Sequence, residues 1–234
     1  MSSYSKDRIH SLFSVVPKTY EKINHMLTFG LDMYWRNRAA TMACRISAAR
    51  ILDCCSGTGE FAAAIHRRMP KCRLLVAGDF SREMLKYSKT RIRFVKMTRI
   101  LMEAETLPFS ESSMDLVTIS FGVRNINRSN DIFQMCISEC YRVLTPGGRL
   151  ILVETSQPPN RIIRRLYHLY VRVAVEKIGS ILSKTKSPYR YLSRTIPSFY
   201  TPNELSSILR SVGFKEIRIY PLTLGIVCVH EAFK

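Results

Sequence analysis

The 234-residue sequence has no apolar run approaching the length of a membrane-spanning helix, about 18 to 20 residues. Its first ten residues lack the apolar core of a secretory signal peptide. Acidic residues are scarce, 18 against 36 lysines and arginines, so the formal net charge at pH 7 is +18. We therefore expect a cytoplasmic chain whose positive charge attracts a polyanion, either nucleic acid or an anionic membrane surface. A proteome-wide bias would explain the same charge equally well.

Cysteine occurs seven times, an odd count, and never as a Cys-x-x-Cys pair. Cys54 and Cys55 are adjacent, and Cys136 and Cys140 lie one helical turn apart. A zinc site needs two close ligand pairs or a combined Cys/His set, and neither spacing is present. We therefore expect reduced, packed thiols and no metal. Hydrophobic residues make up 46% of the chain, which predicts a globular protein with a sizeable core.

The stretch Ile51–Glu60, Ile-Leu-Asp-Cys-Cys-Ser-Gly-Thr-Gly-Glu, carries the most information in the chain. It predicts an apolar strand over Ile51–Asp53, a loop, and a helix over Glu60–Arg68. Gly57 and Gly59 have no side chains, so the loop backbone can approach a ligand closely. The free N–H groups at the start of the helix add a partly positive pole. Together these features predict a nucleotide-type cofactor site at the edge of a parallel sheet.

The loop alone does not identify the cofactor. Gly57-x-Gly59-x-x-Ala62 also fits the dinucleotide fingerprint, with alanine in the third place. Asp79, about twenty residues later, supplies the acid that either cofactor needs for its ribose hydroxyls. A turn without a ligand is a third interpretation, but Asp79 at the expected end of a second strand argues against it.

Strands and helices alternate through the middle of the sequence. Asp115–Ser120 is apolar on both sides, as a buried parallel strand should be, and Thr145-Pro-Gly-Gly148 ends a helix and turns the chain. The alternation predicts an α/β fold with a doubly wound, mostly parallel, Rossmann-like sheet. The expected strands are Ile51–Asp53, Arg73–Asp79, Ile92–Lys96 or its neighbourhood, Asp115–Ser120 and Arg149–Glu154, and the helices between them are Glu60–Arg68, Arg82–Lys89 and Asp131–Leu144.

The end of the chain departs from this alternation. A helix over Thr201–Val212 begins with Thr-Pro-Asn-Glu and stops at Gly213. Two strands follow, Lys215–Leu222 and Ile226–Phe233, and the short link between them demands an antiparallel pair. A parallel sheet that ends in an antiparallel hairpin is the arrangement of S-adenosylmethionine (SAM) methyltransferases. A dinucleotide enzyme of this length would need more chain for its substrate domain, so the hairpin favours SAM.

Three blocks of sequence also carry a family likeness, and together they cover nearly the whole chain. They are Phe13–Tyr20 with Asn24, Met26, Phe29-Gly30 and Trp35; Leu107–Phe109 to Asn125, continuing over Tyr141–Leu150; and Tyr189–Leu192 with Gly213-Phe214 and the last strand. The chain resembles the C-methyltransferases of ubiquinone and menaquinone biosynthesis. The specific element is Ser120-Phe-Gly-Val-Arg-Asn125, because the glycine loop and the Pro-Gly-Gly turn occur across SAM methyltransferases.

With this resemblance we expect one methyltransferase domain over residues 1–234, with a helical cap over about 1–49 and a helical lid over about 156–200. The resemblance implies that SAM contacts Thr58, Asp79, Glu103, Ala104 and Ser120. Gly57 and Gly59 would give backbone clearance, and Asp53 would hold the loop or face the methionine ammonium. Two departures from the family pattern stand at the cofactor site. The family usually has Asp-Leu-x-x-Gly-Thr-Gly-Asp at the first loop, where this chain has Cys54-Cys55-Ser56 after Asp53 and ends in Glu60. The family's frequent Asn-Ala near the adenine is Glu103-Ala104 here.

The implied reaction is methyl transfer from SAM to a ring carbon of a reduced polyprenyl quinone precursor, with demethylmenaquinol to menaquinol as the first choice. The carbon becomes nucleophilic as a neighbouring hydroxyl loses its proton, and a fixed cation stabilises the charge on oxygen. We expect Arg124, just past the fourth strand, to stabilise the phenolate directly or through a water, and Asn125 to orient the ring. Arginine is a poor proton acceptor, so water or another base takes the proton. A surface arginine paired with an acid is the alternative.

Aromatic and basic residues near the C-terminus are weaker candidates for the substrate wall: Tyr189, Arg190 and Tyr191. Tyr20 and His25 are weaker still, and either could simply pack. The segment Arg161–Ile178 alternates apolar and basic residues at near-helical spacing. Such a helix can lie on an anionic membrane, where a lipophilic quinol resides, and would place the chain on the inner face of the cytoplasmic membrane. A packed cap helix with a solvated basic face explains the pattern equally well.

Two other functions compete with quinol methylation. The charge favours a SAM-dependent RNA methyltransferase, but enzymes that methylate amino groups usually have Asn/Asp-Pro-Pro-aromatic after the fourth strand. Ser120-Phe-Gly-Val123 stands there instead, and Gln157-Pro-Pro-Asn160 comes one strand later. A catalytically silent SAM-fold partner protein would have a damaged cofactor loop, whereas the loop glycines and Asp79 are present. We therefore expect a lipophilic quinol as the partner and no nucleic acid.

Overall fold

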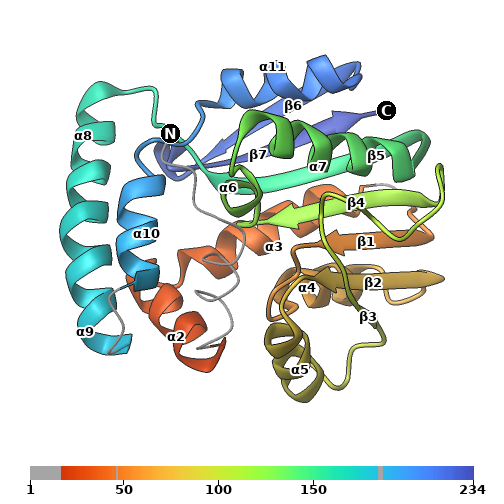
Figure 1. The fold of residues 1–234 in the computed structure, drawn as a ribbon, viewed down its shortest axis with the longest axis horizontal. Helices are drawn as coiled ribbons and strands as arrows, with labels where there is room; N and C mark the ends of the chain where they lie inside the picture. The colour runs from red at the N-terminus through yellow and green to blue at the C-terminus, as the bar shows by residue number, and fades with distance from the viewer. Residues whose placement is uncertain (1–16, 46, 184–186) are drawn as a thin grey trace.

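A computed structural model of the chain describes residues 17–45, 47–183 and 187–234. A seven-stranded sheet runs through the middle, in the order β3-β2-β1-β4-β5-β7-β6 (Figure 1). The strands are β1 Arg50–Cys54, β2 Leu74–Asp79, β3 Thr98–Leu101, β4 Met114–Ser120, β5 Leu144–Thr155, β6 Glu216–Leu222 and β7 Val227–Phe233.

The first five strands of the chain are parallel, and the last two are antiparallel to their neighbours. β1 pairs in parallel with β2 and β4, while β7 lies antiparallel between β5 and β6. This confirms the predicted doubly wound sheet that ends in an antiparallel hairpin. The register places Asp53 of β1 level with Ala77 of β2 and Thr118 of β4, so the carboxyl ends of these strands meet at one edge.

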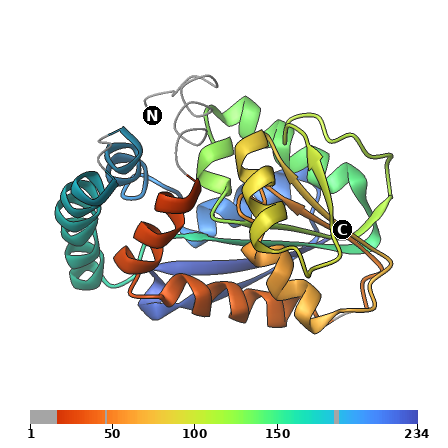
Figure 2. The same ribbon diagram turned by 90° about the horizontal axis from the view of Figure 1, so that it is seen from below.

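Helices cover both faces of the sheet, and alternate strand residues serve the two layers (Figure 2). Ile51 of β1 packs with α3 and α4, whereas its neighbour Leu52 packs with α7 and α11. This alternation is the period of two that a strand buried on both faces requires. The helices around the sheet are α3 Leu31–Ala43, α4 Glu60–Arg68, α5 Arg82–Arg91, α6 Val123–Ile126, α7 Asn130–Val143 and α11 Pro202–Val212.

The third strand, predicted at Ile92–Lys96 or its neighbourhood, begins at Thr98, just after that range. Helix α5 continues to Arg91, and the chain then turns, with Val95 N–H donating to the carbonyl of Ile92. Pairing with β2 begins only at Thr98, opposite Val76. The apolar residues that indicated a strand therefore belong to a turn. Helix α7 ends at Val143, just before Thr145–Gly148, as predicted. These four residues fall within β5 but form an irregularity, because the register jumps from Leu144 opposite Met114 to Arg149 opposite Leu116 and Gly147 has a positive φ.

A second group of helices stands at one end of the sheet (Figure 1). It consists of α2 Pro17–Leu27, α8 Arg161–Tyr170, a π-helix Val171–Ile178, α9 Gly179–Ser183 and α10 Ser187–Thr195. The segments that we expected as cap and lid include residues 1–16, 46 and 184–186, which lie outside the described residues, as does the side chain of Tyr20. Within the described ranges, no helix combines the length and the apolar character needed to cross a bilayer.

Candidate active site

A cavity of about 220 Å³ opens where the carboxyl ends of β1, β2 and β4 meet. Open α/β sheets bind their ligands at this edge because the loops leaving the strands enclose a crevice there. The wall contains eight of the predicted site residues: Gly57, Thr58, Asp79, Glu103, Ala104, Ser120, Arg124 and Asn125. The N-terminal helices supply another wall, with Glu21, Asp32 and Trp35 among the lining residues.

The two loop glycines have different roles. Both have positive φ, +54° at Gly57 and +81° at Gly59, which is the left-handed region that glycine adopts without strain. A Cβ at Gly57 would meet nothing within 4 Å, and this residue lines the cavity. A Cβ at Gly59 would lie 2.5 Å from Ser88 Oγ, so this glycine lets α4 and α5 approach each other. Only Gly57 leaves backbone open to a ligand.

Asp79 ends β2 at the cavity wall, and its carboxylate organises the loops around it. Oδ2 accepts from Gly57 N–H at 2.8 Å, and Oδ1 accepts from Ser81 N–H at 2.8 Å. Each carboxylate oxygen can accept a second hydrogen bond, so capacity for ligand hydroxyls remains. Burial raises the pKa of Asp79 to about 6, against the lowering effect of these two N–H donors.

Asp53 lies one strand away and does not line the cavity. Its Oδ2 accepts from Ala62 N–H at 3.1 Å and its Oδ1 from Thr118 Oγ1–H at 2.7 Å. The carboxylate thus joins the start of α4 to β4 and holds the loop, which is one of the two roles expected for it. Burial raises the pKa of Asp53 to about 7, although both donors lower it.

Replacing Asp53 by asparagine should change how stability depends on pH. The folded-state pKa of about 7 exceeds the usual 3.8, so between these values the folded chain holds a proton that the unfolded chain releases. The wild type should therefore lose stability relative to Asp53→Asn as pH rises from about 4 to about 7. Denaturant unfolding of both proteins at about pH 4.5 and about pH 8 measures the difference, because these two pH values lie on either side of the Asp53 pKa of about 7.

Asp115→Asn is the matched control, because burial raises the pKa of Asp115 but hydrogen bonds from Arg50 outweigh this and leave it lowered. The Asp115 carboxyl should affect the pH dependence of stability in the opposite direction. Stability should increase with pH over the acidic range in which this carboxyl loses its proton. Equal pH profiles for the wild type and Asp53→Asn would contradict the assigned titration.

The remaining cofactor candidates give a direct test of whether SAM fits. Ser120 Oγ and Ser56 Oγ are buried in the cavity wall and have no hydrogen-bond partner within the described part of the chain. Thr58, Glu103 and Ala104 line the same cavity, next to the acceptor carboxylate of Asp79. Unpartnered hydroxyls, an acceptor carboxylate and a bare glycine backbone suit a polar nucleoside, so these residues fit the cofactor.

Arg124 is a buried cation in the wall of the same cavity, in the short helix α6 that follows β4. Its backbone N–H donates to Glu154 Oε2 at 3.1 Å, and its Nη1 donates to Thr155 Oγ1 at 3.4 Å. The guanidinium Nη1 lies 3.9 Å from Glu154 Oε1. Both side chains are less than 10% exposed, so their electrostatic interaction is weakly screened. Arg124 is thus fixed by a buried acid and not by the surface pairing that was the alternative.

The C-terminal candidates divide between the cavity and the core. Tyr191 donates from its hydroxyl to Asn125 Oδ1 at 3.1 Å, so it supports a lining residue. Tyr189 is buried against Gly179, and Arg190 is half-exposed with its Nε 3.6 Å from Glu176 Oε1. Leu192 and Ile196 of the same segment line the cavity instead. The sequence located the right stretch, but the helical turn brings the following apolar side chains to the wall.

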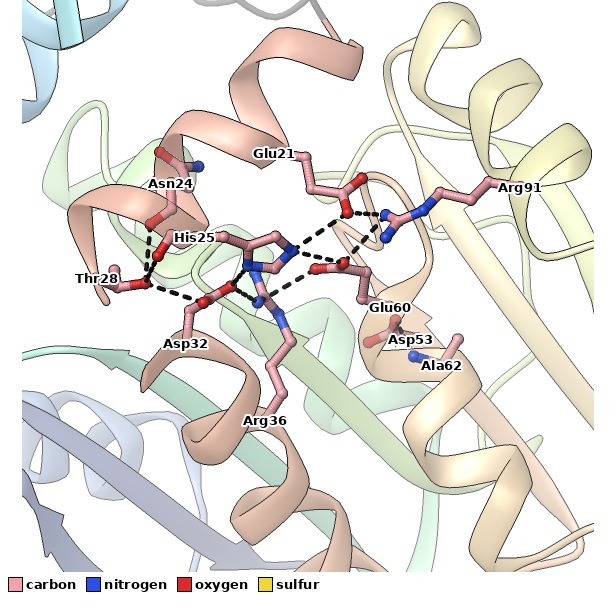
Figure 3. A network of polar contacts seen from close by, with 10 residues as sticks. All are labelled: Glu21, Asn24, His25, Thr28, Asp32, Arg36, Asp53, Glu60, Ala62 and Arg91. Atoms are coloured by element: carbon pink, nitrogen blue, oxygen red, sulfur yellow. Dashed lines mark hydrogen bonds and ion pairs between the residues drawn. The ribbon is translucent and has the colours of Figure 1, made fainter. Parts of the chain in front are cut away.

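A network of charged side chains between the N-terminal helices and the cofactor loop was not predicted from the sequence (Figure 3). Glu60, the first residue of α4, has Oε1 3.1 Å from Arg91 Nη1 and 3.3 Å from His25 Nε2. Its Oε2 lies 3.3 Å from Arg36 Nη1, and Arg91 also pairs with Glu21. The only available signal was Glu60 itself, a departure from the usual aspartate. Through its contacts with His25 and Arg36, Glu60 connects α2 and α3 to α4, the helix that starts at the glycine loop.

The same network extends to Asp32 at the cavity wall. Its Oδ2 lies 2.7 Å from His25 Nδ1 and 2.5 Å from Arg36 Nη1, while Thr28 Oγ1–H donates to its Oδ1. Burial raises the pKa of Asp32, but Arg36 and His25 outweigh it and leave the pKa lowered. Among the described residues, Glu21, His25 and Glu60 are spaced as a cation site could be. Both carboxylates of this group form ion pairs with arginines, Glu21 with Arg91 and Glu60 with Arg91 and Arg36, so their negative charge is neutralised within the protein.

The fold and the cavity together define a class I SAM-dependent methyltransferase. The match to the ubiE/COQ5 methyltransferase family covers residues 1–234, and the chain belongs to this family. It is 34% identical over 233 residues to the ubiquinone/menaquinone biosynthesis C-methyltransferase UbiE of Geotalea daltonii, covering 97% of each chain. It is 33% identical over 221 residues to the demethylmenaquinone methyltransferase of Thermus thermophilus, covering 94% of this chain and 98% of that one.

Solved structures support the same fold at lower sequence identity. A SAM-dependent methyltransferase of Thermotoga maritima, described as a possible histamine N-methyltransferase, gives a TM-score of 0.63 at 17% identity, over 97% of this chain and 99% of that one. Human N-acetylserotonin methyltransferase in complex with SAM gives 0.61 at 18% identity, over 89% of this chain and 55% of that one. The predicted fold, enzyme class and cofactor are confirmed by the family and these neighbours.

Proposed function

We propose that this enzyme methylates a ring carbon of a reduced polyprenyl quinone precursor, with demethylmenaquinol as the substrate and menaquinol as the product. The observation that carries the proposal is Arg124, a buried cation in the wall of the cofactor cavity. A phenolic substrate develops negative charge on oxygen as its ring carbon attacks, and a cation already fixed in place stabilises that charge. The relatives named for demethylmenaquinone and for ubiquinone/menaquinone biosynthesis support this substrate class.

The cofactor half of the cavity would bind SAM through residues at the strand ends. Asp79 would accept hydrogen bonds from the ribose hydroxyls, and Glu103 with Ala104 would border the adenine. Gly57, Thr58 and Ser120 would contact the remainder of the cofactor through backbone and hydroxyl groups. When bound, SAM supplies an electrophilic methyl group on a sulfonium. The protein's part is to hold that group in line with the ring and to exclude water.

On the substrate side, Arg124 would act as an electrostatic residue and not as a base. A guanidinium does not release its proton near neutral pH, so the phenolic proton leaves to water or to another base. The same holds for the proton on the ring carbon, which must leave after the methyl group is added so that the ring becomes aromatic again. Asn125, whose Oδ1 accepts from Tyr191 O–H, would use its amide NH₂ to orient a ring oxygen. Leu192 and Ile196 give this part of the cavity an apolar wall that suits an aromatic ring and the start of a prenyl tail.

The tail of such a substrate also decides where the enzyme must work. Each buried methylene contributes roughly 0.8 kcal/mol, so a polyprenyl chain remains in the bilayer. The proposal therefore includes peripheral contact with an anionic membrane, where the quinol can enter the cavity without its tail crossing water.

The direct test is methyl transfer from labelled SAM to chemically reduced demethylmenaquinone with a short tail, with bulk RNA as a parallel acceptor. We expect label in the quinol ring and none in RNA. Label in RNA alone would overturn the proposal and make the positive charge the relevant signal. Label in neither acceptor, with SAM binding intact by calorimetry, would reject this ring as the substrate.

A further inference from the structure

A row of exposed apolar side chains runs along the outermost helix of the molecule. Its members are each between 45% and 75% exposed: Ile162, Leu166, Leu169, Val173, Ile178 and Ile181. Spacings of four, three and four residues place the first four on one face of a helix. The next spacing is five, within the π-helix Val171–Ile178, where hydrogen bonds also span five residues and the face is preserved. We call these six residues the apolar row.

The opposite face of the same helix is packed, so the exposure of the apolar row does not reflect a loosely attached segment. Val171 and Val175 are buried against Tyr189, Leu192 and Ile196 of the neighbouring segment. Gly179 continues this face, because a Cβ there would lie 2.2 Å from the Tyr189 ring. Tyr170 O–H donates to the carbonyl of Leu27, which ties the helix to α2.

Positive side chains border the apolar row. Arg161, Arg165 and Arg172 are exposed, and their spacings of four and seven place them in a line on one side of it. From Asn160 to Val175 the segment contains four arginines and no acid. Glu176, the next acid, is engaged by Arg190 and by Ser193 O–H. A face with insertable apolar side chains and adjacent arginines complements the hydrocarbon and phosphate layers of an anionic bilayer.

The helix that carries this face packs against the segment whose Leu192 and Ile196 line the cavity. Gln157 Oε1 lies 2.8 Å from His168 Nε2 of α8, and its amide donates to the carbonyl of the lining residue Ile196. Tyr167, on the inner side of α8, lies in the electrostatic field of Arg124, and burial raises its pKa. Helix α10 stands between α8 and the sheet (Figure 1), so two helices, the outer one and α10, separate the apolar row from the cavity.

We propose that the apolar row and the arginines beside it dock the enzyme on the surface of an anionic phospholipid bilayer. The inference rests on the proposed function for its purpose, because a membrane-resident quinol needs a short path to Arg124. The docking itself is a separate physical property, since it depends only on side chains that point away from the cavity. The apolar side chains enter the acyl boundary, and the guanidinium groups pair with lipid phosphates.

Vesicle sedimentation tests the proposal with the full chain. The vesicles contain equal parts of phosphatidylcholine and phosphatidylglycerol, or phosphatidylcholine alone. The test variant is Leu166→Glu with Leu169→Glu, and the control is Phe94→Glu with Met135→Glu, which makes the same change at exposed apolar residues elsewhere. We expect binding to the anionic vesicles, at least about tenfold weaker binding by the test variant, and unchanged binding by the control.

A second variant separates charge from insertion. Arg161→Gln with Arg165→Gln should reduce the preference for anionic vesicles without adding a charge to the apolar row. Thermal unfolding of all variants should match the wild type, because the replaced side chains are exposed. Failure of the wild type to bind anionic vesicles, or equal binding by the test and control variants, would overturn the proposal. Binding to RNA that competes with vesicles and resists the Leu166→Glu, Leu169→Glu change would overturn it as well.

An assay of methyl transfer to a short-tailed, water-soluble quinol tests the proposed function without membrane docking, so the two proposals can fail separately. The test variant should methylate that acceptor at the wild-type rate and lose at least about tenfold in rate on a long-tailed quinol in vesicles. Vesicle binding without any quinol methylation would reject the proposed function and leave the docking intact. Methylation of the soluble acceptor without vesicle binding would reject the docking alone.

Discussion

Replacing Arg124 by alanine should lower the turnover of the quinol by about 100- to 1000-fold, the range for removing one preorganised charge-stabilising donor. The side chain is held by Thr155 and lies 3.9 Å from the buried Glu154, so its charge is already in position before reaction. Single-turnover transfer of labelled methyl measures the chemical step. The dissociation constant of SAM should change little, because Arg124 follows β4, whereas Asp79 ends β2, two strands away in the sheet.

Two further variants show whether the loss concerns the reaction or the fold. Arg124→Ala leaves Glu154 buried without the neighbouring guanidinium, which also costs stability. Arg149→Ala is the matched control, since Arg149 pairs at 2.7 Å with the buried Glu231 away from the cavity. It should lose stability and keep turnover per folded molecule. Arg124→Lys should recover part of the turnover, because it restores charge without the planar fork. Full turnover in Arg124→Ala would remove this residue from the mechanism.

Replacing Asp79 by alanine should weaken SAM binding by at least about tenfold, and isothermal titration calorimetry measures this loss. The carboxylate would supply the acceptors for both ribose hydroxyls, and it also holds the N–H groups of Gly57 and Ser81. Its removal therefore affects both the direct contact and the shape of the loop. Asp79→Asn keeps the size and one acceptor oxygen, so it should weaken binding less than alanine does.

The dependence on pH separates the two effects of Asp79. Its pKa of about 6 means that the carboxyl is ionised at neutral pH and gains a proton below about 6. Protonation removes an acceptor, so the wild-type dissociation constant should rise as pH falls from 7 to 5, on either side of about 6. The asparagine variant should show no such change. Wild-type affinity that is constant with pH, or unaltered by Asp79→Ala, would reject the ribose contact.

The sheet was predictable because its strands are buried on both faces and its ends carry clear turns. Residues Ile51–Asp53 and Asp115–Ser120 are apolar on both sides, and Thr223–Gly225 is too short for a parallel connection. The third strand, predicted at Ile92–Lys96 or its neighbourhood, begins just after that range, because Ile92 and Val95 have strand-forming side chains but occupy a turn. β3 lies at the sheet edge, partly exposed, and so lacks the continuous apolar signal of a central strand.

The cavity was predictable where adjacent residues share a strand end, and not where distant segments meet. Gly57 and Asp79 could be assigned because they stand where neighbouring parallel strands end at the same edge, whereas Ser120 was expected from the family resemblance. The network around Glu60 joins residues 21, 25, 36, 60 and 91, and no local pattern indicates which charges will pair across such distances. The Tyr189–Tyr191 segment was found, but the rotation of its helix decides which side chains line the wall.

The π-helix Val171–Ile178 makes the length of this segment as important as its composition. A π-turn accommodates one residue more than an α-turn, so it acts as a single-residue insertion that the helix absorbs without breaking. A deletion there would rotate everything downstream by on the order of 100°. Gly179 would leave the Tyr189 ring, and Ile178 and Ile181 would leave the outer face. A substitution along the segment therefore alters only the side on which that side chain lies, whereas a change of one residue in its length alters both sides of the helix at once.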